Sequence, residues 1–251
     1  MITLETLEKL ARKFQTGVFP NIVREYFQHM FLGELYRFPE AEKLLFKGGT
    51  ALRVVYGSPR FSEDLDFSLF GVSQNHVKTF VEELFVAVLA KMELVGIKVE
   101  VGAKSYATSG GYFGMATFKM SEYPPVSVEI NVSTRKGRNR QGEVDNVASD
   151  FTPTYTVVHL PQNKLVEEKV FGALRERKKP RDFYDLYFLM RKGMLSPDQK
   201  KRLSEMKDKI IKDAIKIDFR GELGAFLPTN QQAIIRDFVR ALKAEMNRQT
   251  G

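Results

Sequence analysis

The stretch LLFKGGTALRVVYGSPRFSEDLDFSL, residues 44–69, decides the fold of this chain. Its pattern predicts a strand, a glycine turn, a short helix, a loop and a second strand. The first apolar run ends at Gly48 and Gly49, where the backbone can adopt dihedral angles barred to other residues. Thr50 stands where the N-cap of a helix over residues 51–56 is expected. The free N–H groups at that helix start would favour an anion beside the two glycines.

Two aspartates, Asp64 and Asp66, stand at the start of the second predicted strand. Residues two apart on an extended chain project from the same face, so these carboxylates would repel each other unless a cation lies between them. Mg2+ suits such a pair, because it takes oxygen ligands and completes its shell with water and phosphate oxygens. A phosphate cradle followed by a metal-binding pair predicts chemistry on a nucleoside triphosphate. The alternative for the pair alone is a solvated strand end.

Two blocks of sequence carry a family resemblance. The first is FKGGTAL at residues 46–52 with RFSEDLDF at residues 60–67, and the second is KLVEEKVFGA at residues 164–173 with RDFYDLY at residues 181–187. In this order they resemble the AbiEii nucleotidyltransferases, the toxin halves of type IV toxin–antitoxin and phage-abortive systems, which include the MenT enzymes. The matching blocks cover about the middle half of the chain.

The resemblance implies a nucleotide site built from both blocks. It implies that Gly48, Gly49, Thr50 and also Ser62 cradle the β and γ phosphates, with Lys169 as a point charge on them. Threonine at position 50 departs from the Gly-Ser of the wider superfamily but keeps the hydroxyl. A P-loop kinase is excluded, because the order of a P-loop is lacking here.

Further carboxylates are implied by the same resemblance. The family places an acidic residue of the second block at the nucleotide site, which indicates Asp182 and leaves Asp185 as the alternative. Asp182 also stands at an expected helix N-terminus, where a carboxylate is often only a cap. Related nucleotidyltransferases often add a third metal-binding carboxylate from a strand beside the aspartate pair. Glu129 is the candidate, because apolar and polar residues alternate over residues 126–133 and place it on the polar face. Its alternative is an ordinary solvent-facing strand residue.

The composition bounds the class of protein. The 251 residues include no cysteine, which excludes disulfides, thiolate zinc sites and a cysteine nucleophile. The first residues are not a signal peptide, and no apolar run approaches a membrane span, so a cytoplasmic protein without membrane contact is expected. The net charge of +8 and pI near 9.5 favour polyanionic partners. A lysine-rich surface that only keeps the protein soluble is the alternative.

The order of elements predicts an α+β fold, with a mixed β-sheet flanked by helices and a helical C-terminal half. The resemblance specifies the sheet as the nucleotidyltransferase type. Helices are expected over residues 3–15, 20–37 and 74–95, strands over 97–101, 112–120, 126–132 and 155–160, and helices from 163 onward. We expect a nucleotidyltransferase core over residues 1–160 with two N-terminal helices. A helical domain over residues 161–251 is expected to complete the active site.

The predicted reaction moves a nucleotidyl group from a nucleoside triphosphate to an acceptor hydroxyl and releases pyrophosphate, with one or two Mg2+ ions held by Asp64 and Asp66. The resemblance and the basic charge indicate RNA, specifically the 3′ end of tRNA, as acceptor, and an antitoxin as protein partner. Four cations within residues 135–140 predict a mobile loop that could bind nucleic acid. The rival hypotheses are transfer to a small molecule or a protein, and a non-catalytic binding module.

Overall fold

The computed structural model describes residues 2–101, 105–119, 123–135 and 141–250. The chain forms two compact units: unit 1 contains Met1–Gly57 and Phe61–Leu160, and unit 2 contains Ser58–Arg60 and Pro161–Gly251. The predicted α+β class with a helical C-terminal half is confirmed. The three residues of unit 2 that interrupt unit 1 lie in the loop between the strands of the opening motif, which the sequence pattern did not indicate.

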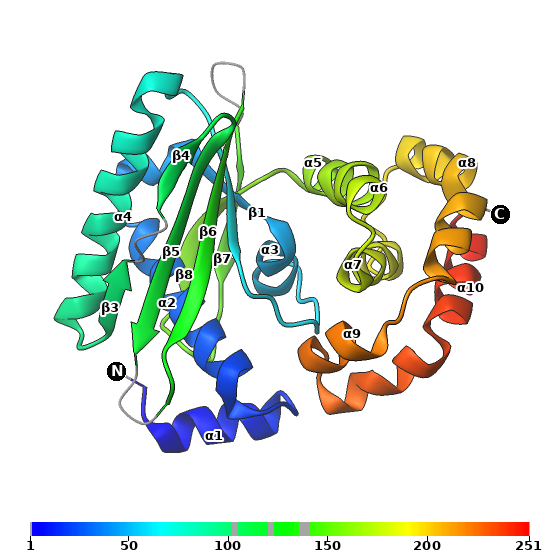
Figure 1. The fold of residues 1–251 in the computed structure, drawn as a ribbon, viewed down its shortest axis with the longest axis horizontal. Helices are drawn as coiled ribbons and strands as arrows, with labels where there is room; N and C mark the ends of the chain where they lie inside the picture. The colour runs from blue at the N-terminus through cyan, green and yellow to red at the C-terminus, as the bar shows by residue number, and fades with distance from the viewer. Residues whose placement is uncertain (1, 102–104, 120–122, 136–140, 251) are drawn as a thin grey trace. The chain divides into compact units, whose positions relative to one another are not determined.

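Within the described residues, eight strands of unit 1 form one mixed sheet in the order β3-β5-β6-β2-β1-β8-β7, with β4 paired to β5 (Figure 1). The strands are β1 Leu44–Lys47, β2 Leu65–Leu69, β3 Lys98–Val101, β4 Tyr106–Thr108, β5 Gly111–Lys119, β6 Val126–Thr134, β7 Glu143–Val147 and β8 Tyr155–His159. β2 runs antiparallel to β1 and parallel to β6, while β8 runs parallel to β1. Both strands of the opening motif are therefore central in the sheet.

Two short strands, β4 and β7, were not predicted. The three residues of β4 are exposed, and four of the five residues of β7 are exposed as well. Neither strand has the alternation of apolar and polar residues that marks a half-buried strand in the sequence. Of the basic stretch predicted to be a loop, residues 136–140 lie outside the described residues.

The helices of unit 1 are α1 Leu4–Lys13, α2 Val23–Leu35, α3 Gly48–Val54 and α4 Val77–Leu94, with short helical segments η1 Val18–Ile22, η2 Pro39–Lys43 and η3 Gln74–His76. α2 and α4 pack against each other and against strands of the sheet, and α3 lies on the other side (Figure 1). Phe67 of β2 faces the α4 side, where its ring centroid lies 6.3 Å from that of Phe85. Because side chains alternate along a strand, Asp66 projects toward the α3 side.

Within its described residues, unit 2 is built of helices joined by non-helical connections. Its helices are α5 Gln162–Val166, α6 Leu174–Glu176, α7 Pro180–Arg191, α8 Pro197–Ala214, α9 Arg220–Phe226 and α10 Phe238–Thr250, with η4 Glu167–Ala173 and η5 Thr229–Asp237. α10 packs on α7 and α8, and aromatic rings fill the contact region, with Phe219 and Phe238 centroids 4.6 Å apart. None of the helices in the described parts of the chain has the length and apolarity needed to cross a membrane.

Candidate active site

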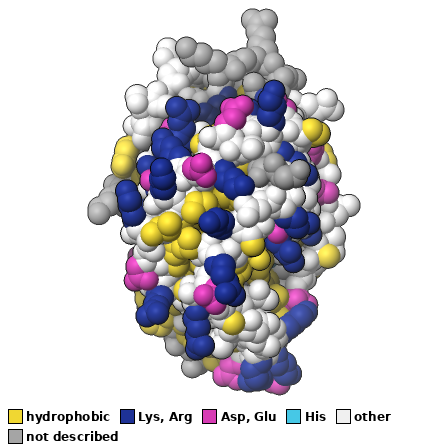
Figure 2. All heavy atoms as spheres, turned by 90° about the vertical axis from the view of Figure 1, so that its right-hand side faces the viewer, with side chains coloured by type: hydrophobic (Ala, Val, Ile, Leu, Met, Phe, Trp, Pro, Cys, Tyr) yellow, Lys and Arg dark blue, Asp and Glu magenta, His cyan; other side chains and the backbone are white. Residues whose placement is uncertain are grey.

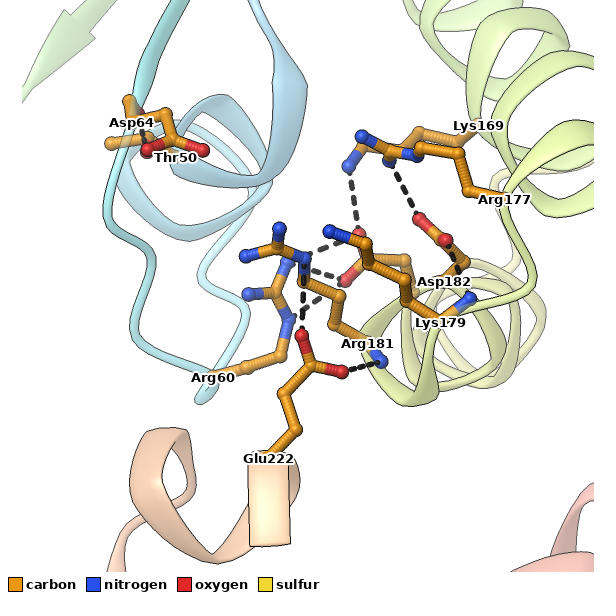
Figure 3. A network of polar contacts seen from close by, with 10 residues as sticks. Thr50, Arg60, Asp64, Lys169, Arg177, Lys179, Arg181, Asp182 and Glu222 are labelled. Atoms are coloured by element: carbon orange, nitrogen blue, oxygen red, sulfur yellow. Dashed lines mark hydrogen bonds and ion pairs between the residues drawn. The ribbon is translucent and has the colours of Figure 1, made fainter. Parts of the chain in front are cut away.

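The glycine turn of the opening motif leads directly into helix α3. The helix begins at Gly48 with Lys47 as its N-cap residue, so the predicted N-cap role of Thr50 is wrong. Thr50 lies in the first turn, is 1% exposed, and donates its hydroxyl proton to the backbone carbonyl of Asp64 (Figure 3). The prediction failed because the hydroxyl is used by a tertiary partner that local sequence does not reveal. Thr50 thereby ties the start of α3 to the segment that carries the aspartates.

Asp66 lies against the same glycine turn. Gly48 has φ +82°, and a Cβ built there would stand 2.1 Å from Asp66 Oδ2. Only glycine fits this close approach of backbone and carboxylate. In the strand registers, Asp66 is opposite Lys47 of β1 and Asn131 of β6, so these three side chains project from one face of the sheet. Sequence reasoning missed Lys47 and Asn131, although the alternation over residues 126–133 places Asn131 on the polar face.

Asp64 immediately precedes β2 and lies two residues before Asp66. The segment leading to it is held from α2. The buried Gln28 side chain donates from Nε2 to the carbonyls of Ser62 and Glu63, at 3.1 Å each. The Ser62 carbonyl is therefore occupied by this contact, and the Ser62 side chain is half-buried. This bracing fixes the approach to the carboxylate pair.

Glu129 lies on β6, the strand beside β2, and its side chain is exposed. The register Leu65 to Ile130 and the alternation of side chains place Glu129 on the same face as Asp66. Within the described residues, however, no three His, Cys, Asp or Glu side chains come together as a group that could hold a metal ion. The pair Asp64 and Asp66 stays the candidate donor set. A pair fits Mg2+, which is commonly held by one or two carboxylates together with water and substrate phosphates.

A buried ion pair fixes α3 from within unit 1. Arg53 Nε lies 2.8 Å from Glu25 Oε1, and the Arg53 guanidinium stands 3.8 Å from the ring centroid of Phe61. Burial alone would raise the pKa of the Glu25 carboxyl, but the charge of Arg53 and the hydrogen bonds of Arg53 and His29 lower it below its usual value. Glu25 thus stays ionised, and its pair with Arg53 links α2 to the helix that follows the glycine turn.

In unit 2, Lys169 lies in the π-helical segment η4 and contacts Asp185 of α7, with Nζ 2.8 Å from Oδ2. Arg60 binds the same carboxylate, with Nη2 2.9 Å from Oδ1 (Figure 3). The side chain of Asp185 is 1% exposed. Its burial would raise the pKa of the carboxyl, but the charges of Arg60 and Lys169 and their hydrogen bonds hold that pKa below its ordinary value. Asp185 is therefore a buried carboxylate anion between two cations.

Asp182 has a different environment in the same unit. One of its oxygens accepts a hydrogen bond from Arg177 Nη2 at 2.7 Å, and the other accepts one from the backbone N–H of Lys179 at 3.0 Å (Figure 3). It thus caps the N-terminus of α7. Of the two aspartates that the sequence left open, Asp185 is the one that contacts Lys169.

The fold of the chain is similar to that of two solved structures. One is a candidate nucleotidyltransferase from H. pylori, with 19% identity, a TM-score of 0.63, and coverage of 92% of this chain and 94% of that one. The other is JHP933 from Helicobacter pylori, with 19% identity, a TM-score of 0.62, and coverage of 100% of this chain and 94% of that one. The expected nucleotidyltransferase-type sheet is thus confirmed.

The family is shown by sequence. The model of the nucleotidyl transferase AbiEii toxin family, type IV toxin–antitoxin system, matches residues 31–249, which is most of the chain. This protein belongs to that family, as its two motif blocks indicate. The comparison with curated proteins gave no match.

Proposed function

We propose that this member of the AbiEii toxin family is a magnesium-dependent enzyme that transfers a nucleotidyl group from a nucleoside triphosphate to an acceptor hydroxyl. The observation that carries the proposal is the contact between Asp66 and the glycine turn, where a Cβ on Gly48 would lie 2.1 Å from Oδ2. A metal-binding carboxylate and a turn suited to phosphate are thereby adjacent within one unit. The π-helical segment that carries Lys169 adds support, because π-helical turns are frequently found at functional sites.

The reaction has a defined role for each group. The acceptor hydroxyl loses its proton to water and its oxygen forms a bond to the α-phosphorus. The bond from that phosphorus to the bridging oxygen breaks, and pyrophosphate leaves. Mg2+ bound by Asp64 and Asp66 would activate the acceptor hydroxyl and stabilise charge on the phosphates. The backbone N–H groups of Gly48, Gly49 and Thr50, which precede the first intrahelical bonds of α3, bind phosphate oxygens, with Ser62 as a further contact. Lys169 supplies a point charge to the leaving pyrophosphate.

The remaining site residues take supporting roles in this proposal. Asp182 holds the N-terminus of α7, the helix that also carries Asp185. Glu129 stands on the strand next to the pair and would contribute through a water ligand, which a bound Mg2+ commonly keeps. This arrangement needs no histidine or cysteine.

The acceptor we propose is the 3′ end of tRNA, with growth arrest as the outcome and an antitoxin as protein partner. The distribution of charge supports a polyanionic acceptor. Residues 161–251 contain 21 Lys and Arg against 13 Asp and Glu, whereas residues 1–160 contain 18 of each, so the whole surplus of eight lies in the C-terminal part. Figure 2 shows Lys and Arg side chains scattered over the face in view, among fewer Asp and Glu side chains and some hydrophobic ones. Such a surface attracts a phosphate backbone without selecting a sequence. We place the reaction in the cytoplasm, where tRNA and triphosphates are available.

The test of this function uses each α-labelled nucleoside triphosphate in turn with total RNA, Mg2+ and the purified protein. We expect label to migrate with RNA of tRNA size, and to disappear when Mg2+ is chelated. Label on protein or on a small molecule would show a different acceptor. If no triphosphate is bound or consumed, the enzyme function is overturned and the fold serves only for binding.

Exposed lysines of α8 are expected to contribute to RNA affinity. Lys201, Lys209 and Lys212 are exposed on this helix. Their joint replacement by glutamine should weaken RNA binding and lower the slope of log affinity against log salt by about 2, because each lost phosphate contact on a single strand lowers it by about 0.7. Triphosphate binding should stay unchanged. The matched control replaces the exposed Lys78, Lys91 and Lys98 of unit 1, and an equal loss there would contradict the assignment.

A further inference from the structure

Arg60 belongs to the RFSEDLDF motif, yet none of the roles given so far explains it. Its side chain is 2% exposed and lies in unit 2. Nε and Nη2 donate to Asp185 Oδ1 at 3.0 and 2.9 Å, and Nη2 also reaches Oδ2 at 3.1 Å. Lys169 Nζ shares Oδ2 at 2.8 Å (Figure 3). One buried carboxylate therefore binds two cations from distant parts of the sequence.

The charges of this cluster do not cancel. Arg60 and Lys169 are positive and Asp185 is negative, so the three groups together keep one positive charge. Arg60 holds the carboxylate with two donors, Nε and Nη2, along one edge of its guanidinium, which lysine cannot reproduce because its ammonium is a compact point charge. Without Arg60, Asp185 and Lys169 would form a neutral pair, and Lys169 would attract an anion far less strongly. The Arg60 guanidinium therefore decides whether the positive charge of Lys169 is neutralised by Asp185 or can attract another anion.

We propose that Arg60 is a positioning residue for nucleotide binding. Arg60 neutralises the Asp185 carboxylate and holds it in place beside Lys169. The positive charge of the Lys169 ammonium then stays available to the phosphates of the triphosphate. This inference rests on the proposed function of Lys169. The Lys169 ammonium has three N–H donors, and its bond to Asp185 Oδ2 orients it.

The experiment measures the Kd of Mg-ATP and the other Mg-triphosphates by calorimetry, with kcat, KM and melting temperature for each variant. Arg60→Met should weaken triphosphate binding at least about tenfold, since it leaves Lys169 neutralised by Asp185. The double variant Arg60→Met with Asp185→Asn should recover affinity to within about threefold of wild type, because removing the carboxylate charge returns the lysine charge. Arg60→Lys should lie between wild type and Arg60→Met. A merely structural ion pair predicts the opposite, namely that the double variant binds no better than Arg60→Met.

Two variants keep the test decisive. If Arg60→Met does not fold, Arg60→Lys decides, because it keeps the positive charge but loses the paired bonds to Asp185 and should bind triphosphate more weakly than wild type. A folded Arg60→Lys protein that binds triphosphate as tightly as wild type overturns the proposal. Arg202→Met is the matched control, since Arg202 also holds a carboxylate with two bonds, to Glu167 at 2.9 and 2.7 Å, and its loss should leave Kd unchanged.

Failure of the inference is distinguishable from failure of the proposed function. Lys169→Met should weaken triphosphate binding in every background. If it binds as wild type does, the role of Lys169 itself is overturned, and with it the premise of this inference. If Lys169→Met loses affinity but the double variant does not recover, the role of Lys169 stands and that of Arg60 falls.

Discussion

Replacing Asp64 or Asp66 by asparagine is expected to reduce nucleotide transfer about a thousandfold or more while the protein stays folded. Each substitution keeps the shape of the side chain but removes the charge that binds the metal ion. Loss of about 4 kcal/mol of transition-state stabilisation corresponds to about a thousandfold in rate. The measurement is incorporation of α-labelled triphosphate at saturating Mg2+, with circular dichroism to verify the fold. Titration with Mn2+ and Mg2+ should show a lower affinity for the metal ion in both variants.

The control for this prediction is Glu100→Gln, which neutralises an exposed carboxylate on β3 of the same sheet and should leave the rate unchanged. Glu129→Gln tests whether a neighbouring carboxylate also matters, because Glu129 lies on the same face of the sheet as Asp66 but is not part of a three-residue metal group. Its effect should be much smaller than that of either aspartate. A wild-type rate in folded Asp64→Asn or Asp66→Asn would remove the metal assignment altogether.

Gly48→Ala is expected to destabilise the protein and to abolish transfer. Its added Cβ would stand 2.1 Å from Asp66 Oδ2, and the residue must hold φ at +82°. Positive φ alone costs an L-residue about 1–2 kcal/mol, so the free energy of unfolding should fall by more than this amount. The carboxylate must also move away from the turn, which separates the metal ligand from the phosphate site. Chemical denaturation and the labelled-triphosphate assay give the two readouts.

Gly57→Ala separates backbone strain from the clash. Gly57 has φ +75°, and nothing lies within 4 Å of a Cβ built there. This variant should lose about 1–2 kcal/mol of stability from the positive φ and keep its activity. Equal activity losses in the two alanine variants would mean that the contact of Asp66 with the turn has no part in the reaction.

The sequence predicted the central elements well, and the reason lies in their patterns. Alternation over residues 126–132 located β6, and helical spacing located α1 and α4 within a few residues. β4 and β7 escaped because their exposed side chains follow no apolar pattern. The order of strands could not be derived either, since which strands lie beside one another depends on contacts between residues far apart in the chain.

For the candidate site, too, the sequence predicted some features and the tertiary structure was needed for others. The motif blocks identified the glycine turn, the aspartate pair, Lys169 and the choice between Asp182 and Asp185. They did not indicate that the Thr50 hydroxyl binds the Asp64 carbonyl. A helix cap was the alternative considered for Asp182, and Asp182 does cap α7. Donors and acceptors within a motif look alike in the sequence whether their partner is a substrate or another part of the chain.

The sequence by itself determined the family, the order of most strands and helices along the chain, and the residue types that can bind metal and phosphate. Only the tertiary structure decided that Asp66 touches the turn at Gly48 and that Arg60 and Lys169 share Asp185. The physical reason is that spacing along the chain fixes local geometry, whereas a buried ion pair forms only where folding brings distant charges together and removes water from between them.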